Sequence, residues 1–117
     1  MTSKMNPASH LPLTPAMYHV LLALADGDKH GYAIMKDAKI NSGEEVSLSP
    51  GTLYENVHRL AERGLIEELG PEVDGRTDGR GQRFYSLTGV GLEVLRTEVA
   101  RLARDVDLAR SLPALGT

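Results

Sequence analysis

The sequence predicts a single, mainly α-helical domain that carries a small β-hairpin and ends in a long helix. Apolar residues recur at helical spacing between residues 14 and 64, with capping residues before the runs and glycines after them. A glycine-rich stretch at residues 70–81, flanked by two short runs with strand-like character, predicts the hairpin. Helical spacing then returns and continues to Pro113. A chain of 117 residues has room for one hydrophobic core of this kind.

The composition is that of a soluble globular protein, with 41% hydrophobic and 25% charged residues. No apolar run approaches the roughly 20 residues that cross a membrane, and the first residues lack the apolar core of a secretory signal. The absence of cysteine excludes disulfides and thiolate chemistry and agrees with a cytoplasmic location. The net charge of −3 weighs against nucleic-acid binding by the whole surface, but two basic islands, residues 29–39 and 76–83, could bind phosphates locally.

Two helices are expected in the first third of the chain. Residues 1–12 contain two prolines and no sustained helical period, so we expect a flexible N-terminal arm. Thr14 is the expected N-cap of the first helix, with Pro15 at its first position. The buried stripe of this helix is expected to be Met17, Val20, Leu21 and Leu24. A second helix is expected over residues 30–40, and its buried side is expected to be Tyr32, Met35 and Ala38.

The third helix has the clearest amphipathic pattern. Ser49 is its expected N-cap, Pro50 occupies the first turn, and Gly64 is the expected stop. One stripe is apolar and is expected to face the core: Leu53, Val57, Leu60 and Ala61. The opposite stripe consists of side chains that carry charge or form hydrogen bonds: Thr52, Glu55, Asn56, Arg59 and Arg63. The sequence thus predicts a polar outer face with little bulk.

Two short strands are expected at residues 65–69 and 83–87. The loop between them holds four glycines and one proline, so it is expected to extend from the body of the domain as a hairpin tip. This tip carries Arg76 and Arg80, which give it a positive charge.

The last helix is expected to begin at Thr88 and to run to Leu112, because Pro113 cannot continue it. Its apolar residues are three and four positions apart: Leu92, Leu95, Val99, Leu102, Val106 and Ala109. This is the seam of a coiled coil, but it lasts only about two and a half heptads, which is too short to be stable alone. The seam therefore needs tertiary support as well.

The order of three helices, a strand, a glycine-rich tip, a strand and a long helix is that of a winged helix-turn-helix domain. In a DNA reader of this kind, a helix offers short polar side chains to base edges in the major groove, while other elements hold phosphates. The polar stripe of the third helix fits the first role. Gly51 would let the backbone approach a phosphate, the N–H groups of the first turn attract anions, and the arginines of the tip suit the backbone or a minor groove.

Four ordered motifs resemble the signature of the PadR family of transcriptional regulators. They are His30-Gly31-Tyr32, residues 49–54, residues 59–66 and residues 83–88, and the resemblance covers residues 13 to about 95. It implies a winged helix-turn-helix dimer that acts mostly as a repressor and dimerises through its C-terminal helix. The positions that touch DNA in the family match Tyr32, Ser49, Gly51, Thr52 and Tyr54. The family usually has proline where this chain has Glu55. A carboxylate facing DNA would repel phosphate, so Glu55 either reads a cytosine amino group or lies off the contact surface.

These observations give two sets of candidate residues. The candidate DNA contacts are Tyr32, Lys36, Ser49, Gly51, Thr52, Tyr54, Asn56, Arg59, Arg76 and Arg80. The candidate dimer contacts are Leu92, Leu95, Val99, Leu102 and Val106. The expected organisation is an arm (1–12), a DNA-binding winged domain (13–88), a dimerisation helix (89–112) and a tail (113–117). The expected partners are double-stranded DNA with a palindromic operator and a second copy of the chain.

Other functions have less support in the residues. The four histidines are scattered without metal-ligand spacing, and no arrangement suggests a nucleophile or an acid–base pair, so we expect no metal, cofactor or enzyme activity. A protein-interaction module on a winged-helix scaffold, without DNA binding, stays open as the alternative. Some PadR-family proteins bind flat aromatic compounds between aromatic side chains at the dimer centre. This chain has no tryptophan and no aromatic residue in its last helix, which disfavours that mode, and the sequence leaves open whether another small-molecule effector exists.

Overall fold

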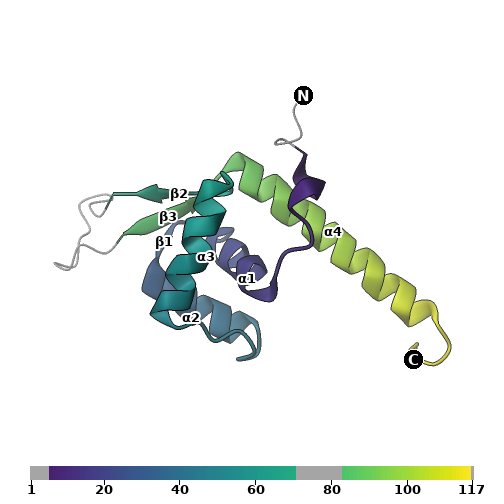
Figure 1. Cartoon of the computed structure of the whole chain (residues 1–117). Coiled ribbons are helices and arrows are strands. Elements are labelled where there is room, and N and C mark those ends of the chain that lie inside the picture. Colours follow the sequence, from purple (N-terminus) through teal and green to yellow (C-terminus); the bar gives the residue numbers. More distant parts are fainter. Residues whose placement is uncertain (1–5, 71–82, 117) are drawn as a thin grey trace.

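The computed structural model describes residues 6–70 and 83–116. In these residues a group of helices packs beside a three-stranded antiparallel sheet, and a long helix leaves the domain (Figure 1). The elements in chain order are the 3-10 helix η2 (Pro7–His10), α1 (Pro15–Leu24), β1 (Lys29–His30), α2 (Gly31–Asn41), α3 (Pro50–Glu62), β2 (Ile66–Leu69), β3 (Phe84–Leu87) and α4 (Gly89–Ser111). The predicted fold class, mainly helical with a small hairpin and a C-terminal helix, is confirmed.

The helix starts lie where the sequence predicts them, because capping is a local interaction. The Ser49 hydroxyl accepts a hydrogen bond from the Thr52 N–H at 3.2 Å, and Pro50 follows at the first position of α3. Thr14 caps α1 in the same way. After α3 the chain turns at Gly64 with φ of 77°, a left-handed conformation that glycine adopts without strain.

The sheet has one strand more than the sequence predicts. β3 lies in the middle, and β1 and β2 pair with it in antiparallel fashion on either side. β1 has only two residues, with Lys29 opposite Tyr85 and His30 opposite Phe84. A run of two residues is too short to show an alternating pattern, which is why it was missed. Burial raises the pKa of Tyr85 to about 12, so this tyrosine is a neutral core residue.

α1 lies at the centre of the core and contacts α2, α3, β3 and α4. The largest fully buried side chains come from all four α-helices and from the entry to β2: Val20, Leu21, Ile34, Leu53, Leu60, Leu65, Ile66, Val94 and Glu98. A Cβ on Gly91 would lie 2.0 Å from the Leu65 carbonyl oxygen. Only glycine therefore allows the first turn of α4 to pack against the chain entering β2, which fixes α4 relative to the hairpin.

Two residues that were predicted to be buried are exposed. Tyr32 is 65% exposed, and Ala61 on α3 also faces solvent. The predicted stripe on α2 advanced by three residues at each step, and such a row drifts around a helix of 3.6 residues per turn. The residues of α2 that are buried are Gly31, Ile34 and Ala38. Met35 is only half-buried at the edge of the core.

The segment before α1 is not the flexible arm predicted for residues 1–12. Residues 7–10 form η2, which contacts α4, and Leu11 packs against the core. The Leu13 N–H donates a hydrogen bond to the buried Glu98 carboxylate at 3.0 Å. The prediction is therefore wrong for residues 7–12. The contacts that hold this segment are with residues far along the chain, so no local pattern predicts them.

Candidate nucleic-acid interface

α3 turns its polar face to solvent. Its inner side buries Leu53, Val57 and Leu60. On its outer side Thr52, Glu55 and Arg59 are exposed and Asn56 is half-buried. α3 runs along the near side of the domain in Figure 1, between α2 and the hairpin strands. The outer face of α3 is thus accessible to a partner that can exchange hydrogen bonds with it.

The side chains of this face are positioned by their own helix. The Asn56 amide nitrogen donates to the Thr52 carbonyl oxygen at 2.8 Å. The Arg59 guanidinium lies 3.6 Å from the Glu55 carboxylate, and both side chains are more than half exposed, at 58% and 64%. An exposed ion pair of this kind contributes about 1 kcal/mol or less, so Arg59 can exchange Glu55 for another acceptor at little cost.

The start of α3 is open as well. Ser49 is exposed, and its hydroxyl donates to the Thr52 hydroxyl at 3.1 Å in addition to capping the helix. A Cβ on Gly51 would meet no atom within 4 Å, so packing within the chain does not require glycine there. The first turn carries the positive end of the helix dipole, which favours a bound anion.

Tyr54 connects α3 to the start of α2. A Cβ on Gly31 would lie 2.7 Å from the Tyr54 hydroxyl oxygen and 3.1 Å from the Leu53 side chain. Gly31 of the first motif and Tyr54 of the second are thus packed against each other. Tyr54 remains 49% exposed, so its ring has both a contact with α2 and a free surface.

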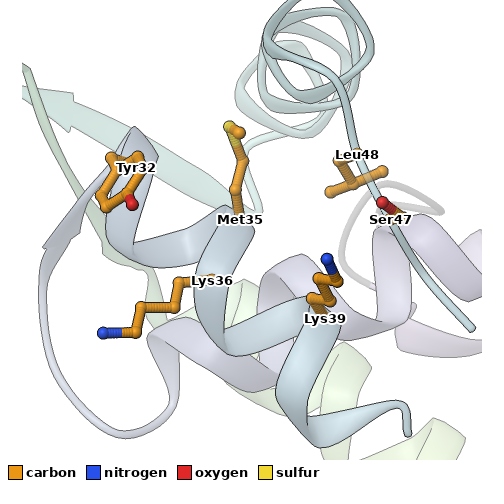
Figure 2. A pocket seen from close by; sticks show the side chains of 6 residues that line it. All are labelled: Tyr32, Met35, Lys36, Lys39, Ser47 and Leu48. Atoms are coloured by element: carbon orange, nitrogen blue, oxygen red, sulfur yellow. The ribbon is translucent and has the colours of Figure 1, made fainter. Parts of the chain in front are cut away.

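α2 contributes a second part of the same side of the molecule. His30 caps α2 by accepting from the Ala33 N–H at 3.2 Å, and its ring stacks with the exposed ring of Tyr32 at a centroid distance of 6.5 Å. Lys36 is exposed one turn later. A hollow of about 260 Å³ lies between α2 and the segment before α3 (Figure 2). Its lining residues are Tyr32, Met35, Lys36, Lys39, Ser47 and Leu48.

Arg83, at the base of the hairpin, is paired within the chain. Arg83 pairs with Glu68 on the neighbouring strand, and this hydrogen bond keeps the pKa of Arg83 above its ordinary value. Arg83 is thus occupied by a contact within the sheet. Arg76 and Arg80, the predicted contacts of the wing, lie outside the described residues.

The predicted dimer contacts on α4 divide into two groups. Leu95 is 4% exposed within its own chain, and Leu92 is partly buried. Val99, Leu102 and Val106 are 45%, 36% and 46% exposed, on the half of α4 that leaves the domain (Figure 1). The structure therefore corrects the role of Leu95, which packs into the chain's own core and has almost no surface left for a partner.

The sequence of this chain matches a known family over most of these elements. Residues 20–97 match the model of the transcriptional regulator PadR-like family, which is more than half of the chain. The chain belongs to this family. The matched residues include α2, α3, both hairpin strands and the first part of α4. The family match therefore covers all the candidate DNA contacts, whereas Val99, Leu102 and Val106 on α4 lie beyond it.

Relatives and solved structures agree with the PadR assignment. Transcriptional regulator Rv3488 of Mycobacterium tuberculosis is 35% identical over 91 residues, which are 75% of this chain and 78% of that protein. An uncharacterised 37.1 kDa protein in transposon TN4556 of Streptomyces fradiae is 42% identical over 85 residues, 73% of this chain but 22% of that protein. The structure of Bacillus subtilis PadR in complex with operator DNA has the same fold, with a TM-score of 0.63 and 22% identity over 75% of this chain and 47% of that chain.

Glu55 is the departure from the PadR pattern that the sequence shows. The structure places it on the outer face of α3, exposed, with Arg59 beside it. Its negative charge is thus partly compensated within the helix. This pairing reduces the repulsion of phosphate that an isolated carboxylate would cause.

Glu98 is a residue of this PadR-family chain that the sequence analysis missed. Its side chain is 2% exposed, and its carboxylate accepts hydrogen bonds from the Leu13 N–H at 3.0 Å and from the Arg101 guanidinium at 2.6 and 3.1 Å. The Arg101 hydrogen bonds, helped by the Leu13 N–H, hold the pKa of Glu98 below its ordinary value despite burial. Arg101, three residues later, was the only local signal, because the other partner is far away in the sequence.

The described part of the chain offers no sign of a metal centre. No three histidine, aspartate or glutamate side chains gather there at a distance suited to an ion. None of the helices of the described residues has the length and apolar character that crossing a bilayer requires. The family itself is one of transcriptional regulators rather than of enzymes.

Proposed function

We propose that this PadR-family regulator binds a specific duplex DNA sequence as a homodimer and represses transcription there. The observation that carries the proposal is the exposed polar face of α3, whose side chains have only weak contacts within the chain. An α-helix fits the major groove, where Asn56 suits adenine and Arg59 suits guanine or a phosphate. The open start of α3 at Gly51, the exposed ring of Tyr32 on α2 and the neighbouring Lys36 would hold the adjacent backbone.

The remaining proposed DNA contacts come from the start of α3 and from the wing. Ser49, Thr52 and Tyr54 lie on the start of α3. The wing arginines Arg76 and Arg80 are proposed to contact the DNA backbone. A DNA partner is supported by the related Bacillus subtilis PadR, which was solved with operator DNA. The role requires access to DNA, which agrees with the cytoplasmic location that the sequence predicts.

A homodimer with twofold symmetry would recognise an operator of the same symmetry. The exposed stripe of Val99, Leu102 and Val106 provides an apolar face on the projecting half of α4. Two copies joined there would present two α3 helices, which reach successive major grooves on one side of the duplex when they are about 34 Å apart. We therefore expect a palindromic operator with half-sites about one helical turn apart.

The test is a binding titration by fluorescence anisotropy. The duplexes are the DNA upstream of the protein's own gene and a scrambled duplex of the same composition. The Asn56→Ala variant should lose roughly 1–3 kcal/mol of binding free energy on the operator and little on the scrambled duplex. His58→Ala is the matched control, because His58 lies on the same helix nearly opposite Asn56, outside the polar stripe, and its side chain is 73% exposed.

The outcomes separate the parts of the proposal. Equal affinity for both duplexes would contradict sequence-specific binding. A folded protein that binds neither duplex would favour the protein-interaction alternative. Arg80→Ala should weaken binding to both duplexes alike, since a tip on the backbone carries no sequence information. Expression of the protein should lower transcription from a promoter that contains the operator, and a rise would make the protein an activator.

A further inference from the structure

The hollow beside α2 is built on a fixed base with positive charges at its rim. Met35 and Leu48 pack against the hydrophobic core and form the base. Figure 2 shows Lys36 and Lys39 on successive turns of α2. The Lys39 ammonium points toward Ser47 on the segment that leads to α3, whereas the Lys36 ammonium points to the other side of α2, where Tyr32 lies. Four of the six lining residues are exposed, so the hollow is a shallow seat rather than an enclosed pocket. An open hollow of this kind suits a chemical group that is attached to a larger molecule, because the rest of that molecule can remain outside.

The positive charge at this rim is not compensated. Lys36 and Lys39 have no carboxylate at ion-pair distance among the described residues. Asp37, the acid between them on α2, is instead paired with Lys29 at 2.8 Å. Lys29 itself donates to the Ala23 carbonyl at 2.5 Å and is held in place. In a chain with a net charge of −3, this rim therefore stands out as a local site for an anion.

The position of the hollow connects it with α3. Leu48 immediately precedes Ser49, the N-cap of α3, so an anion in the hollow would lie beside the positive end of that helix. Tyr32 belongs both to the hollow and to the exposed start of α2. The hydroxyls of Tyr32 and Ser47 have no hydrogen-bond partner in the part of the chain that the structure describes. They can therefore donate to oxygen atoms of a ligand.

We infer that this hollow is the seat of one DNA backbone phosphate, held by the Lys39 ammonium and the Ser47 hydroxyl, while Lys36 and the Tyr32 hydroxyl add positive charge and a donor on the other side of α2. The inference rests on the proposed function and extends it to Lys39 and Ser47, to which the motifs assign no role. This phosphate flanks the bases that α3 would read. It supplies affinity and sets the register of α3, but it carries no sequence preference.

The test compares Lys39→Gln with wild type on a random-sequence duplex of about 30 base pairs, which is long enough for two half-sites. Affinity is measured at salt concentrations from roughly 50 to 300 mM. The variant should bind three- to tenfold more weakly at about 100 mM salt, and the slope of log K against log[salt] should become shallower by about 0.9 for each protomer bound. Ser47→Ala should weaken binding without a change in slope, because it removes a neutral donor.

Arg104→Gln is the matched control. Arg104 is an exposed residue of α4 without an ion pair among the described residues, and it lies on the side of that helix away from Val99 and Val106. The Arg104→Gln variant loses the same charge as Lys39→Gln, but on α4 and not at the proposed phosphate contact. Its slope of log K against log[salt] should therefore remain that of wild type. A wild-type slope for Lys39→Gln, in a protein that binds DNA, would overturn the phosphate seat and leave the proposed function intact. Absence of DNA binding by the wild type would overturn both.

Inorganic phosphate provides an independent measurement. Added phosphate should shift the NMR amide signals of residues 36–48 in the free protein. The same addition should cause no shift once DNA is bound, because the DNA backbone then occupies the hollow. Shifts that persist in the complex would mean that the hollow binds a free anion and not the DNA backbone, which would also overturn the inference.

Discussion

The two halves of α4 carry one apolar repeat but differ in what covers it. In the first half Leu92 is partly buried and Leu95 is buried in the core of its own chain, and α1 contacts this helix. In the second half Val99, Leu102 and Val106 keep between 36% and 46% of their surface exposed. The spacing of three and four residues is the same in both halves. The difference teaches that such spacing identifies an apolar face but not the surface that buries it, because the hydrophobic effect does not distinguish the same chain from another.

Leu95→Ala should produce the largest loss of stability. Leu95 is 4% exposed, and deleting a buried leucine side chain costs about 2–5 kcal/mol through lost burial and the cavity that remains. The measurement is urea unfolding at two protein concentrations, with Leu102→Ala as the matched substitution on the outer half. The loss for Leu95→Ala should be the same at both concentrations, whereas that for Leu102→Ala should follow dimer formation. Similar, concentration-independent losses for both variants would remove the distinction between the halves.

Leu102→Asp should convert a dimer into monomers. Burial of this leucine against a partner would contribute roughly 1.5–3 kcal/mol per protomer, and a carboxylate there would oppose association. Light scattering gives the mass, and Arg104→Asp places the same residue on the opposite side of α4 as a control. A dimeric mass for Leu102→Asp would show that the second half of α4 does not form the dimer contact.

Glu98→Gln should have the smallest effect and a characteristic pH dependence. Glutamine keeps an acceptor for the Leu13 N–H but loses the charge that Arg101 stabilises, at a cost of about 1–2 kcal/mol near neutral pH. Arg101 lowers the pKa of Glu98 in the folded state. Its contribution is therefore present above the pKa of the unfolded state, near 4.3, and is lost as the pH falls through the lower folded value.

The measurement for Glu98 is the unfolding free energy of both proteins between neutral and strongly acid pH. The difference between wild type and Glu98→Gln should shrink as the pH falls. A constant difference would mean that the carboxylate charge does not hold the N-terminal segment on α4. Apolar packing alone would then hold this segment on α4.

Much of the candidate interface could be predicted because α3 is specified by local patterns. Ser49 and Pro50 mark its start and Gly64 its end, and the polar and apolar stripes follow from helical geometry. Tyr32 was assigned both to the buried side of α2 and to the DNA contacts, and only the exposed position is observed. The hollow that includes Lys39 was not predicted, because two segments meet there that no motif connects.

The sequence by itself determined the helix starts, the hairpin, the polar face of α3 and the family, since caps, periodicity and motifs are properties of neighbouring residues. Only the tertiary structure decided three further features. β1 joined the sheet, η2 packed on α4 while the Leu13 N–H bonded to Glu98, and Leu95 went into the core while Leu102 stayed outside. The physical reason is the same in each case: these contacts join residues that are far apart in the chain, and their strength depends on burial that only the assembled fold creates.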